Sequence, residues 1–333
     1  MFKVLNAKTA DLVWLKSADL FLQGDEAMSQ SSRAGNTIEI LNAGLCLEDP
    51  RQRWVASREP AINPAFAIAE VVWILSGSNK ADLPNYFNPA LPKYAGYDTK
   101  YHGAYGHRIR NHFGFDQLES AFNALKNNSD TRQVVLQIWD SIADLPRENG
   151  LPLSRDIPCN VNSMLKVRDG RLEWTQIMRS NDLVRGFPHN VVQFTTLQEI
   201  LAGWLNLQVG HYNHYSDSLH VYESDLVGLH SAKQKTLPVN LDNLSVEKIV
   251  SQRAIDALIE FCSKCCEAKV SGKELLSSLG SLTIPPAYKN LALIMGADAL
   301  RRRKANSEME EALSLCSNQC LTFLFMRWRD RKS

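Results

Sequence analysis

A segment in the middle of the chain constrains the fold most, because strand and helix patterns alternate within it. Residues 160–167 and 172–178 are strand-like runs joined by a turn that contains Asp169-Gly170, and such a pair is typical of a β-hairpin. A strongly apolar helix pattern follows over residues 190–205, and an extended pattern over residues 207–220. The segment therefore predicts a mixed α/β core.

The flanking sequence adds further elements to this core. Strands are expected at residues 36–46 and 133–139, and helices at 63–75 and 116–126. Residues 79–106 are rich in Pro, Tyr, Asn and Gly, which predicts an ordered loop. Beyond Pro238 the pattern becomes mostly helical, over residues 246–269, 273–279 and 291–324. We therefore expect two domains, a core at 1–240 and a helical region at 241–333 packed on it.

Charge and hydropathy narrow the function class. Lys and Arg (37) nearly balance Asp and Glu (36), which argues against a large positively charged surface that binds nucleic acid. No apolar run is long enough to cross a bilayer, and the first residues mix charges into apolar positions, unlike a secretion signal. We expect a cytoplasmic protein that acts without a membrane or nucleic-acid partner.

The seven cysteines do not form a convincing metal motif. Cys262, Cys265 and Cys266 lie close together, and Cys316 and Cys320 follow further on, all in helix-like sequence. Neither knuckle glycines nor histidine ligands accompany them. We expect reduced thiols that are buried as small residues, and no metal site.

Cys159 is the candidate nucleophile. It follows Pro158 where a turn-rich stretch meets a predicted strand, and a thiol there can be held at the edge of a pocket. The thiolate is the reactive form and is favoured beside positive charge, which Arg155 or Arg179 could supply. An inert strand cysteine is the alternative.

Polar residues after Cys159 suit a phosphorylated nucleoside. Arg179 and Ser180 offer the donors that a phosphate requires. Asn190, expected at a helix N-cap, carries a donor and an acceptor that suit the edge of a pyrimidine, although it could simply cap the helix. His220 and Tyr222, two residues apart in an extended run, point to the same face, where they could contact a sugar.

Glu70 is the conspicuous charged residue in an apolar helix pattern. It interrupts the run AIAEVVWIL, so a helix there would place it among buried neighbours. Burial penalises the charged form of a carboxylate, which suits a general acid or base near neutral pH. The alternative is a helix face turned to solvent.

Together these motifs resemble the thymidylate synthase family over roughly residues 32–222. The matching stretches are SRAGNT, AEVVWILSGSN, GAYGHRIR, TRQVVLQIWD, IPCN, RSNDLVRGFPHN and HVY, which occur in the family's order. The resemblance implies a thymidylate synthase-like mixed sheet packed with helices, with residues 1–240 as the catalytic core. It also implies a homodimer that acts on a pyrimidine nucleoside monophosphate with methylenetetrahydrofolate.

The resemblance also assigns roles to individual residues. Cys159 would attack C6 of the base, Glu70 and Tyr105 would assist proton transfer, and Asp182 would contact the folate. The base would be recognised by Asn190 and the sugar by His220 and Tyr222. The phosphate ligands would be Arg33, Arg179, Ser180 and, from the second subunit, Arg132.

Several positions depart from the family pattern. Asn160 stands where the family has His, Met178 where it has Gln, and Gln133 where it has a second arginine. The chain carries the charged stretch FMRWRDRKS where the family has a short apolar tail over the folate. Asn190 favours uracil, since relatives acting on dCMP carry Asp there; cytosine, ribose or deoxyribose, and a methyl or hydroxymethyl product stay open. A pyrimidine nucleotide N-glycosidase on this fold and an inactive nucleotide-binding homologue are the alternatives.

Overall fold

The computed structural model describes residues 2–24, 27–32 and 35–331. Two compact units can be distinguished. The first comprises Met1–Ile62, Asp116–Asp140 and Pro158–Thr236. The second comprises the three segments that complete the chain, Asn63–Phe115, Ser141–Ile157 and Leu237–Ser333. Each unit is thus assembled from three separate stretches of the sequence. The two domains expected from the sequence, 1–240 and 241–333, are single continuous stretches, and that division stays a prediction.

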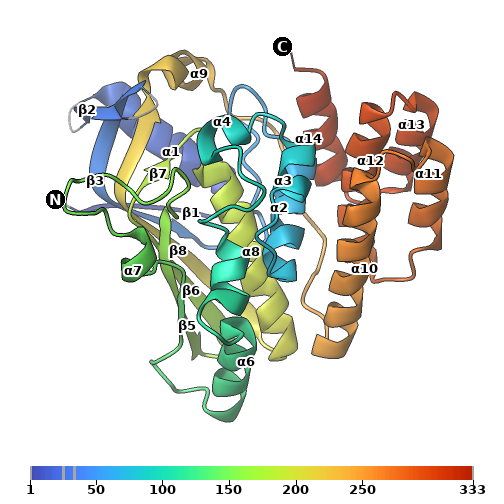
Figure 1. Cartoon of the computed structure of the whole chain (residues 1–333), viewed down its shortest axis with the longest axis horizontal. Helices are drawn as coiled ribbons and strands as arrows, with labels where there is room; N and C mark the ends of the chain where they lie inside the picture. Colours follow the sequence, from blue (N-terminus) through green and yellow to red (C-terminus); the bar gives the residue numbers. More distant parts are fainter. Residues whose placement is uncertain (1, 25–26, 33–34, 332–333) are drawn as a thin grey trace. The chain divides into compact units, whose positions relative to one another are not determined.

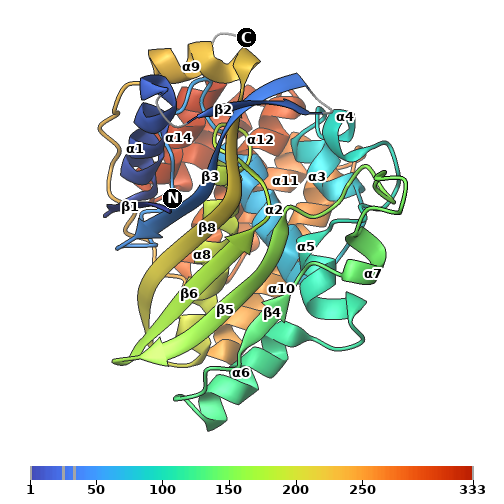
Figure 2. The same cartoon turned by 90° about the vertical axis from the view of Figure 1, so that its left-hand side faces the viewer.

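The first unit is built on one mixed eight-stranded sheet. Its main path runs β1-β3-β8-β6-β5-β4 (Figure 2), with β2 paired to β3 and β7 paired to β8. The strands are β1 (Lys3–Ala7), β2 (Met28–Ser32), β3 (Gly35–Leu47), β4 (Val135–Gln137), β5 (Asn160–Arg168), β6 (Arg171–Met178), β7 (Asn181–Asp182) and β8 (Gln208–Tyr222). The predicted hairpin is confirmed, because Asp169 and Gly170 both have positive φ (49° and 70°) between β5 and β6.

One face of this sheet is covered by α1 (Ala10–Gln23) and α8 (Phe187–Trp204). Neighbouring strands contribute Leu45, His214 and Gln176 to one row on this face, and all three are buried. The aromatic ring of Phe187 in α8 meets the His214 ring edge-on, with centroids 5.3 Å apart. The row beneath α8 is therefore buried but partly polar.

The other face of the sheet is not buried in the same way. The row of register partners Val4, Gly44, Tyr215 and Ile177 contains no buried residue, and Val4 is 67% exposed. The next row, through Cys46, Asn213, Thr175 and Met164, is likewise half-buried.

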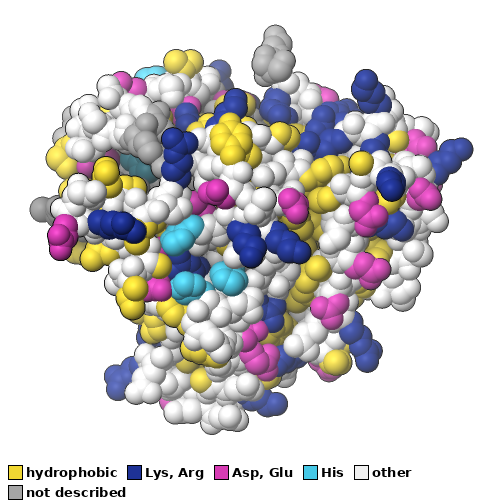
Figure 3. All heavy atoms as spheres, viewed as in Figure 1, with side chains coloured by type: hydrophobic (Ala, Val, Ile, Leu, Met, Phe, Trp, Pro, Cys, Tyr) yellow, Lys and Arg dark blue, Asp and Glu magenta, His cyan; other side chains and the backbone are white. Residues whose placement is uncertain are grey.

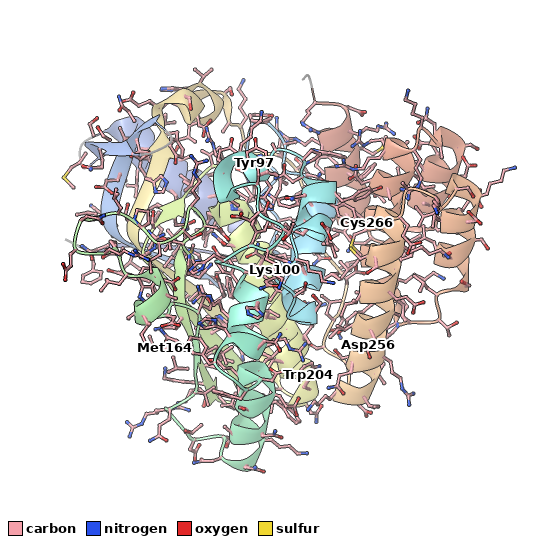
Figure 4. All side chains as sticks on the ribbon, in the orientation of Figure 1. Tyr97, Lys100, Met164, Trp204, Asp256 and Cys266 are labelled. Carbon is pink, nitrogen blue, oxygen red and sulfur yellow. The ribbon has the colours of Figure 1, made fainter. Side chains whose placement is uncertain are left out.

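A short-range cap explains where α6 begins. α6 (Gln117–Asn127) starts after Asp116, whose carboxylate accepts from the backbone amides of Leu118 and Glu119. Trp204, the last residue of α8 (labelled in Figure 4), meets Phe122 of α6 edge-on, with ring centroids 6.1 Å apart. The short element η2 (Glu223–Asp225) follows β8, and α9 (Leu226–Ser231) comes after it (α9 in Figure 1).

The second unit is helical and is organised around α2 (Pro64–Ser76). α2 begins at the Asn63 cap with Pro64 in its first turn, as the sequence predicted, and α3, α5, α10, α12 and α14 pack against it. A Cβ on Gly106 would lie 2.4 Å from the Ile74 carbonyl oxygen, so only glycine permits this approach to α2. Its other elements are α3 (Asp82–Phe87), α4 (Pro92–Ala95), α5 (Tyr105–His107), η1 (Arg108–His112), α7 (Ser141–Asp144), α10 (Lys248–Cys266), α11 (Gly272–Ser281), α12 (Pro286–Arg302), α13 (Asn306–Leu315) and α14 (Gln319–Arg329).

Two expectations about secondary structure were inaccurate, one in each unit. Residues 79–106 are not one loop, because α3 and α4 form within them and Lys80 makes an isolated bridge to Lys100. The strand expected at 133–139 is limited to Val135–Gln137, because Val134 and Ile138 bond to the neighbouring strand outside the regular ladder.

The surface of the C-terminal helices α10–α13 carries basic and acidic side chains interspersed (Figure 3), as their near balance in the sequence suggests. Among the described residues, no helix is both long and apolar enough to span a membrane.

Candidate active site

Cys159 lies immediately before β5, and Arg179 lies immediately after β6, so the hairpin brings the two together. The Arg179 amide donates to the Cys159 carbonyl oxygen (3.0 Å), and its Nε donates to the Pro158 carbonyl oxygen (2.9 Å). Its Nη2 lies 4.0 Å from the half-buried Cys159 Sγ. A guanidinium at this distance stabilises a thiolate, which is the nucleophilic form of cysteine.

Trp139 also lies against this arginine. The Arg179 guanidinium lies over the Trp139 ring, 5.5 Å from its centroid. A cation held over an aromatic face keeps its orientation, and a planar guanidinium can donate to more than one group. The arrangement suits a group that must contact both a thiolate and a phosphate.

Ser180 and His220 come together beside Arg179. The pairing of β7 with β8 sets Asp182 opposite His220, and the Ser180 Oγ lies 3.5 Å from His220 Nδ1. The His220 and Tyr222 rings meet edge-on with centroids 5.7 Å apart, so both side chains lie on one face, as predicted. Burial lowers the pKa of His220, which favours a neutral ring that can accept as well as donate.

Asp182 has two differently used carboxylate oxygens. Oδ1 accepts from the backbone amides of Val184 and Arg185, both at 2.8 Å, and so shapes the turn before α8. Oδ2 is buried without a hydrogen-bond partner among the described residues, and Arg185 Nε lies 4.0 Å from it. Burial raises the pKa of Asp182. A ligand with an N–H donor would satisfy Oδ2.

Asn190 is not an N-cap, contrary to the expectation. Gly186 occupies the cap position, and Pro188 in the first turn starts α8 three residues earlier than predicted. Asn190 is therefore inside the helix, where its side chain is buried and its Nδ2 donates to Asn181 Oδ1 (3.3 Å).

Two of the departures from the family pattern share one buried row. Asn160 and Met178 are register partners on β5 and β6, and both are buried. Asn160 Oδ1 accepts from Gln176 Nε2 (2.8 Å), whereas its Nδ2 has no partner among the described residues. The residue after Cys159 therefore keeps a donor for another group.

The remaining predicted residues are Arg33, Arg132, Glu70 and Tyr105. Arg33 lies outside the described residues. Arg132 is exposed before β4, in the first unit. Glu70 and Tyr105 belong to the second unit, on the neighbouring helices α2 and α5, and both are half-buried. Glu70 is thus less buried than its apolar neighbours Ala69 and Val71.

Sequence reasoning missed three residues at this site. Trp139 follows β4, and its ring lies under the Arg179 guanidinium. Asn181 is the residue between Ser180 and Asp182 in the sequence. His214 carries a buried ring in β8, two residues from both Tyr212 and Ser216. Polar residues at alternate, core-facing positions of an apolar strand were the signal that could have revealed it.

The clustered cysteines are core residues. Cys262 and Cys265 are buried in α10, and Cys266 lies half-buried on the same helix (Figure 4). Burial raises the pKa of Cys266 to about 11 and that of Cys265 further, so these thiols stay protonated at neutral pH. Among the described residues, no three His, Cys, Asp or Glu side chains are arranged to hold a metal ion.

The sequence is similar to several curated proteins. The chain is 37% identical over 179 residues to the deoxyuridylate hydroxymethyltransferase of Pseudomonas phage M6, covering 53% of this chain and 50% of that protein. It is 33% identical over 220 residues to the protein of that name in Bacillus phage SP01, covering 61% and 55%. A putative thymidylate synthase of Methanothermobacter thermautotrophicus is 36% identical over 119 residues, covering 36% and 50%. The chain thus spans about half the length of these curated relatives.

The family model for thymidylate synthase matches residues 54–260, which is more than half of the chain and includes Cys159, Arg179 and Asn190. The mixed sheet with helices on one face is the fold that the sequence predicted. This chain belongs to the thymidylate synthase family.

Proposed function

We propose that the protein transfers a one-carbon unit to C5 of deoxyuridine monophosphate (dUMP), with Cys159 as the nucleophile. The observation that carries this proposal is the position of Cys159 Sγ, 4.0 Å from the Arg179 guanidinium at the end of a hairpin. The relatives named deoxyuridylate hydroxymethyltransferase support deoxyuridylate as the substrate and a hydroxymethyl group as the product.

The chemistry follows from the cysteine. The Cys159 thiolate adds to C6 of the uracil ring, which moves negative charge to O4 and makes C5 a carbon nucleophile. After C5 has gained the one-carbon unit and lost its proton, the carrier of that unit would leave as tetrahydrofolate. Water would then add to the remaining methylene group as the bond from sulfur to C6 breaks, which restores the thiolate and leaves a hydroxymethyl group on C5. Glu70 and Tyr105 are the proposed proton-transfer residues, and Arg33, Arg179 and Ser180 the proposed phosphate ligands.

Methylenetetrahydrofolate would supply the one-carbon unit. The Asp182 carboxylate fits such a donor, because its Oδ2 is buried and lacks a hydrogen-bond partner among the described residues, while a reduced pterin carries N–H groups. Asp182 would bind and orient that ring, and His220 and Tyr222 would hold the sugar of the nucleotide.

The test is the product formed by the wild-type protein. We expect dUMP labelled with tritium at C5 to release its label only when methylenetetrahydrofolate is present, and the mass of the product to identify a methyl or a hydroxymethyl group. Free uracil formed without folate would instead establish an N-glycosidase. Absence of turnover with dUMP, UMP, dCMP or CMP would refute the proposal.

Cys159→Ala should abolish tritium release while nucleotide binding persists, because only the attacking atom is lost. Cys266→Ala is the matched control, since Cys266 is also half-buried but belongs to α10 of the second unit. Undiminished release by Cys159→Ala would show that another group starts the reaction.

We further propose a homodimer formed through the half-buried face of the sheet. Register partners Val4, Tyr215 and Ile177 place apolar surface on that face, and Arg132 is exposed in the same unit. Pairing this face with a second copy would remove apolar surface from water.

Complementation tests whether Arg132 acts in the partner's site. Cys159→Ala and Arg132→Ala should each be inactive alone. Mixed dimers should recover activity, because one of their two sites then has both the cysteine and the arginine. No recovery, in mixtures shown to exchange subunits, would place Arg132 in its own subunit's site or outside the mechanism.

A further inference from the structure

A chain of buried polar side chains runs from Asn190 into the layer between the sheet and α8. Asn190 Nδ2 donates to Asn181 Oδ1 (3.3 Å), and Asn181 Nδ2 donates to His214 Nε2 (2.9 Å) and Ser216 Oγ (3.2 Å). His214 Nδ1 lies 2.9 Å from the Tyr212 hydroxyl. All five side chains are buried, with at most 6% exposed. Such groups are oriented by one another, because water does not compete for their bonds.

The direction of these bonds follows from the placement of the Asn181 amide, whose nitrogen faces His214 and Ser216 and whose oxygen faces Asn190. Burial lowers the pKa of His214 to about 3, so its ring is neutral and has one donor and one acceptor nitrogen. The nitrogen of an amide only donates, so Nε2 is the acceptor for Asn181 and Nδ1–H donates to Tyr212. Turning the Asn181 amide alone would bring its nitrogen against that of Asn190, donor against donor.

Asn190 is therefore held in one orientation. One of its N–H groups is used by Asn181 Oδ1, which is the only side-chain hydrogen bond of Asn190 among the described residues. Its Oδ1 and second N–H make no side-chain hydrogen bond among the described residues and can meet a base. Uracil offers an N3–H donor beside the O4 acceptor, whereas cytosine offers an N3 acceptor beside an amino donor. An amide held in one orientation matches one of these edges and opposes the other.

We infer that Asn181, anchored by His214 and Ser216, is a positioning residue that fixes the Asn190 amide in the orientation that selects uracil over cytosine. The inference rests on the proposed function, because it takes the base as the ligand of Asn190. It adds a specificity-determining role for three residues that do not themselves touch the base.

The test measures the ratio of the affinities for two nucleotides, dUMP and dCMP. Calorimetry gives the dissociation constants of dUMP and dCMP, and the wild-type protein should prefer dUMP. Asn181→Ala frees the Asn190 amide to turn, so the preference should fall about tenfold, equivalent to about 1.4 kcal/mol. Asn181→Asp keeps an acceptor facing Asn190, so most of the preference should persist.

A control variant distinguishes a change in the orientation of the Asn190 amide from a general disturbance of α8. Thr195 is buried in the same helix, and its hydroxyl donates to the Val191 carbonyl oxygen (2.6 Å). Thr195→Val removes that bond and should leave the ratio of the two constants unchanged. Asn181→Ser carries the same expectation as Asn181→Ala if the alanine variant does not fold.

The outcomes distinguish this inference from the proposed function. A wild-type protein that binds neither nucleotide would overturn the proposed function and this inference with it. A wild-type preference for dUMP that survives Asn181→Ala would overturn the inference alone. An equal loss in Asn181→Asp or in Thr195→Val would also overturn it, because the acceptor facing Asn190 would then not be the cause.

Discussion

Buried asparagines occur in both units, and their hydrogen bonds differ. In the second unit, Asn318 Nδ2 donates to Asn240 Oδ1 (2.7 Å) and Asp242 Oδ2 (2.6 Å), and its Oδ1 accepts from the Leu321 amide (3.2 Å). Asn290 likewise donates to Asp242 Oδ1 (2.8 Å) and accepts from the Ser317 amide (3.1 Å). The polar cluster at the start of α14 is thus satisfied within the chain.

The first unit leaves several buried polar atoms available. In the described part of the chain, those without a hydrogen-bond partner include Asn160 Nδ2, Asp182 Oδ2 and Gln193 Oε1, all in this unit. An unsatisfied buried polar group costs roughly 1–3 kcal/mol, a cost that a bound ligand can offset. The satisfied amide of Asn318 thus stabilises the fold, whereas an open buried atom such as Asp182 Oδ2 can be satisfied by a ligand.

Asn318→Ala should have the largest effect of the changes that test this comparison. It breaks three hydrogen bonds, one of them to a carboxylate and one to the Leu321 amide, and should cost about 3 kcal/mol of stability, or roughly 4 °C in melting temperature. Nucleotide affinity of the folded protein should not change. Asn123→Ala, on the exposed face of α6, is the control for both readouts. A loss of nucleotide affinity without a loss of stability would break the comparison.

Asp182→Asn should show the converse pattern with a smaller energy. The amide oxygen can still accept from Val184 and Arg185, so the turn and the melting temperature should persist. The amide NH2 of Asn would replace Oδ2, the oxygen proposed to accept from the folate. The KM for methylenetetrahydrofolate should therefore rise about thirtyfold, equivalent to about 2 kcal/mol. The dissociation constant of dUMP should stay within about twofold.

Asp169→Asn is the control for this change, because Asp169 is exposed in the hairpin turn and Asn tolerates its positive φ. If Asp182→Asn lowers the melting temperature and leaves the KM unchanged, Asp182 belongs with the structural groups.

His214 gives the smallest effect, seen as a dependence of stability on pH. Its pKa is about 3 in the folded protein, against 6.5 for an ordinary histidine. As the pH falls from about 6.5 toward 3, the unfolded chain binds a proton that the folded chain does not, so His214 lowers stability progressively. His214→Gln should remove this contribution, on the order of 1 kcal/mol per pH unit.

Urea midpoints at pH 7 and pH 5 measure this difference. His230→Gln, on the exposed side of α9, should leave the pH dependence as it is in the wild type. The same pH dependence in His214→Gln and in the wild type would mean that the ring is not held neutral, and the direction inferred for its hydrogen bonds would fail.

The sequence by itself determined the elements and much of the site. Asn63-Pro64, Asp116 and Asp169-Gly170 are local signals, and the structure begins or turns the chain at each of them. Cys159, Arg179, Ser180 and Asp182 lie close in sequence around one hairpin, so their proximity followed from its register. His220 and Tyr222 share a face because side chains alternate along a strand.

Only the tertiary structure decided how the polar groups are paired. The sequence placed Asn190 at a helix cap, but Pro188 starts α8 earlier and turns Asn190 toward Asn181. Trp139 and His214 reach the site from β-structure distant in sequence, and no local pattern specifies such contacts. Local signals act over a few residues, whereas the hydrogen bonds of a buried layer depend on which strands and helices are packed together.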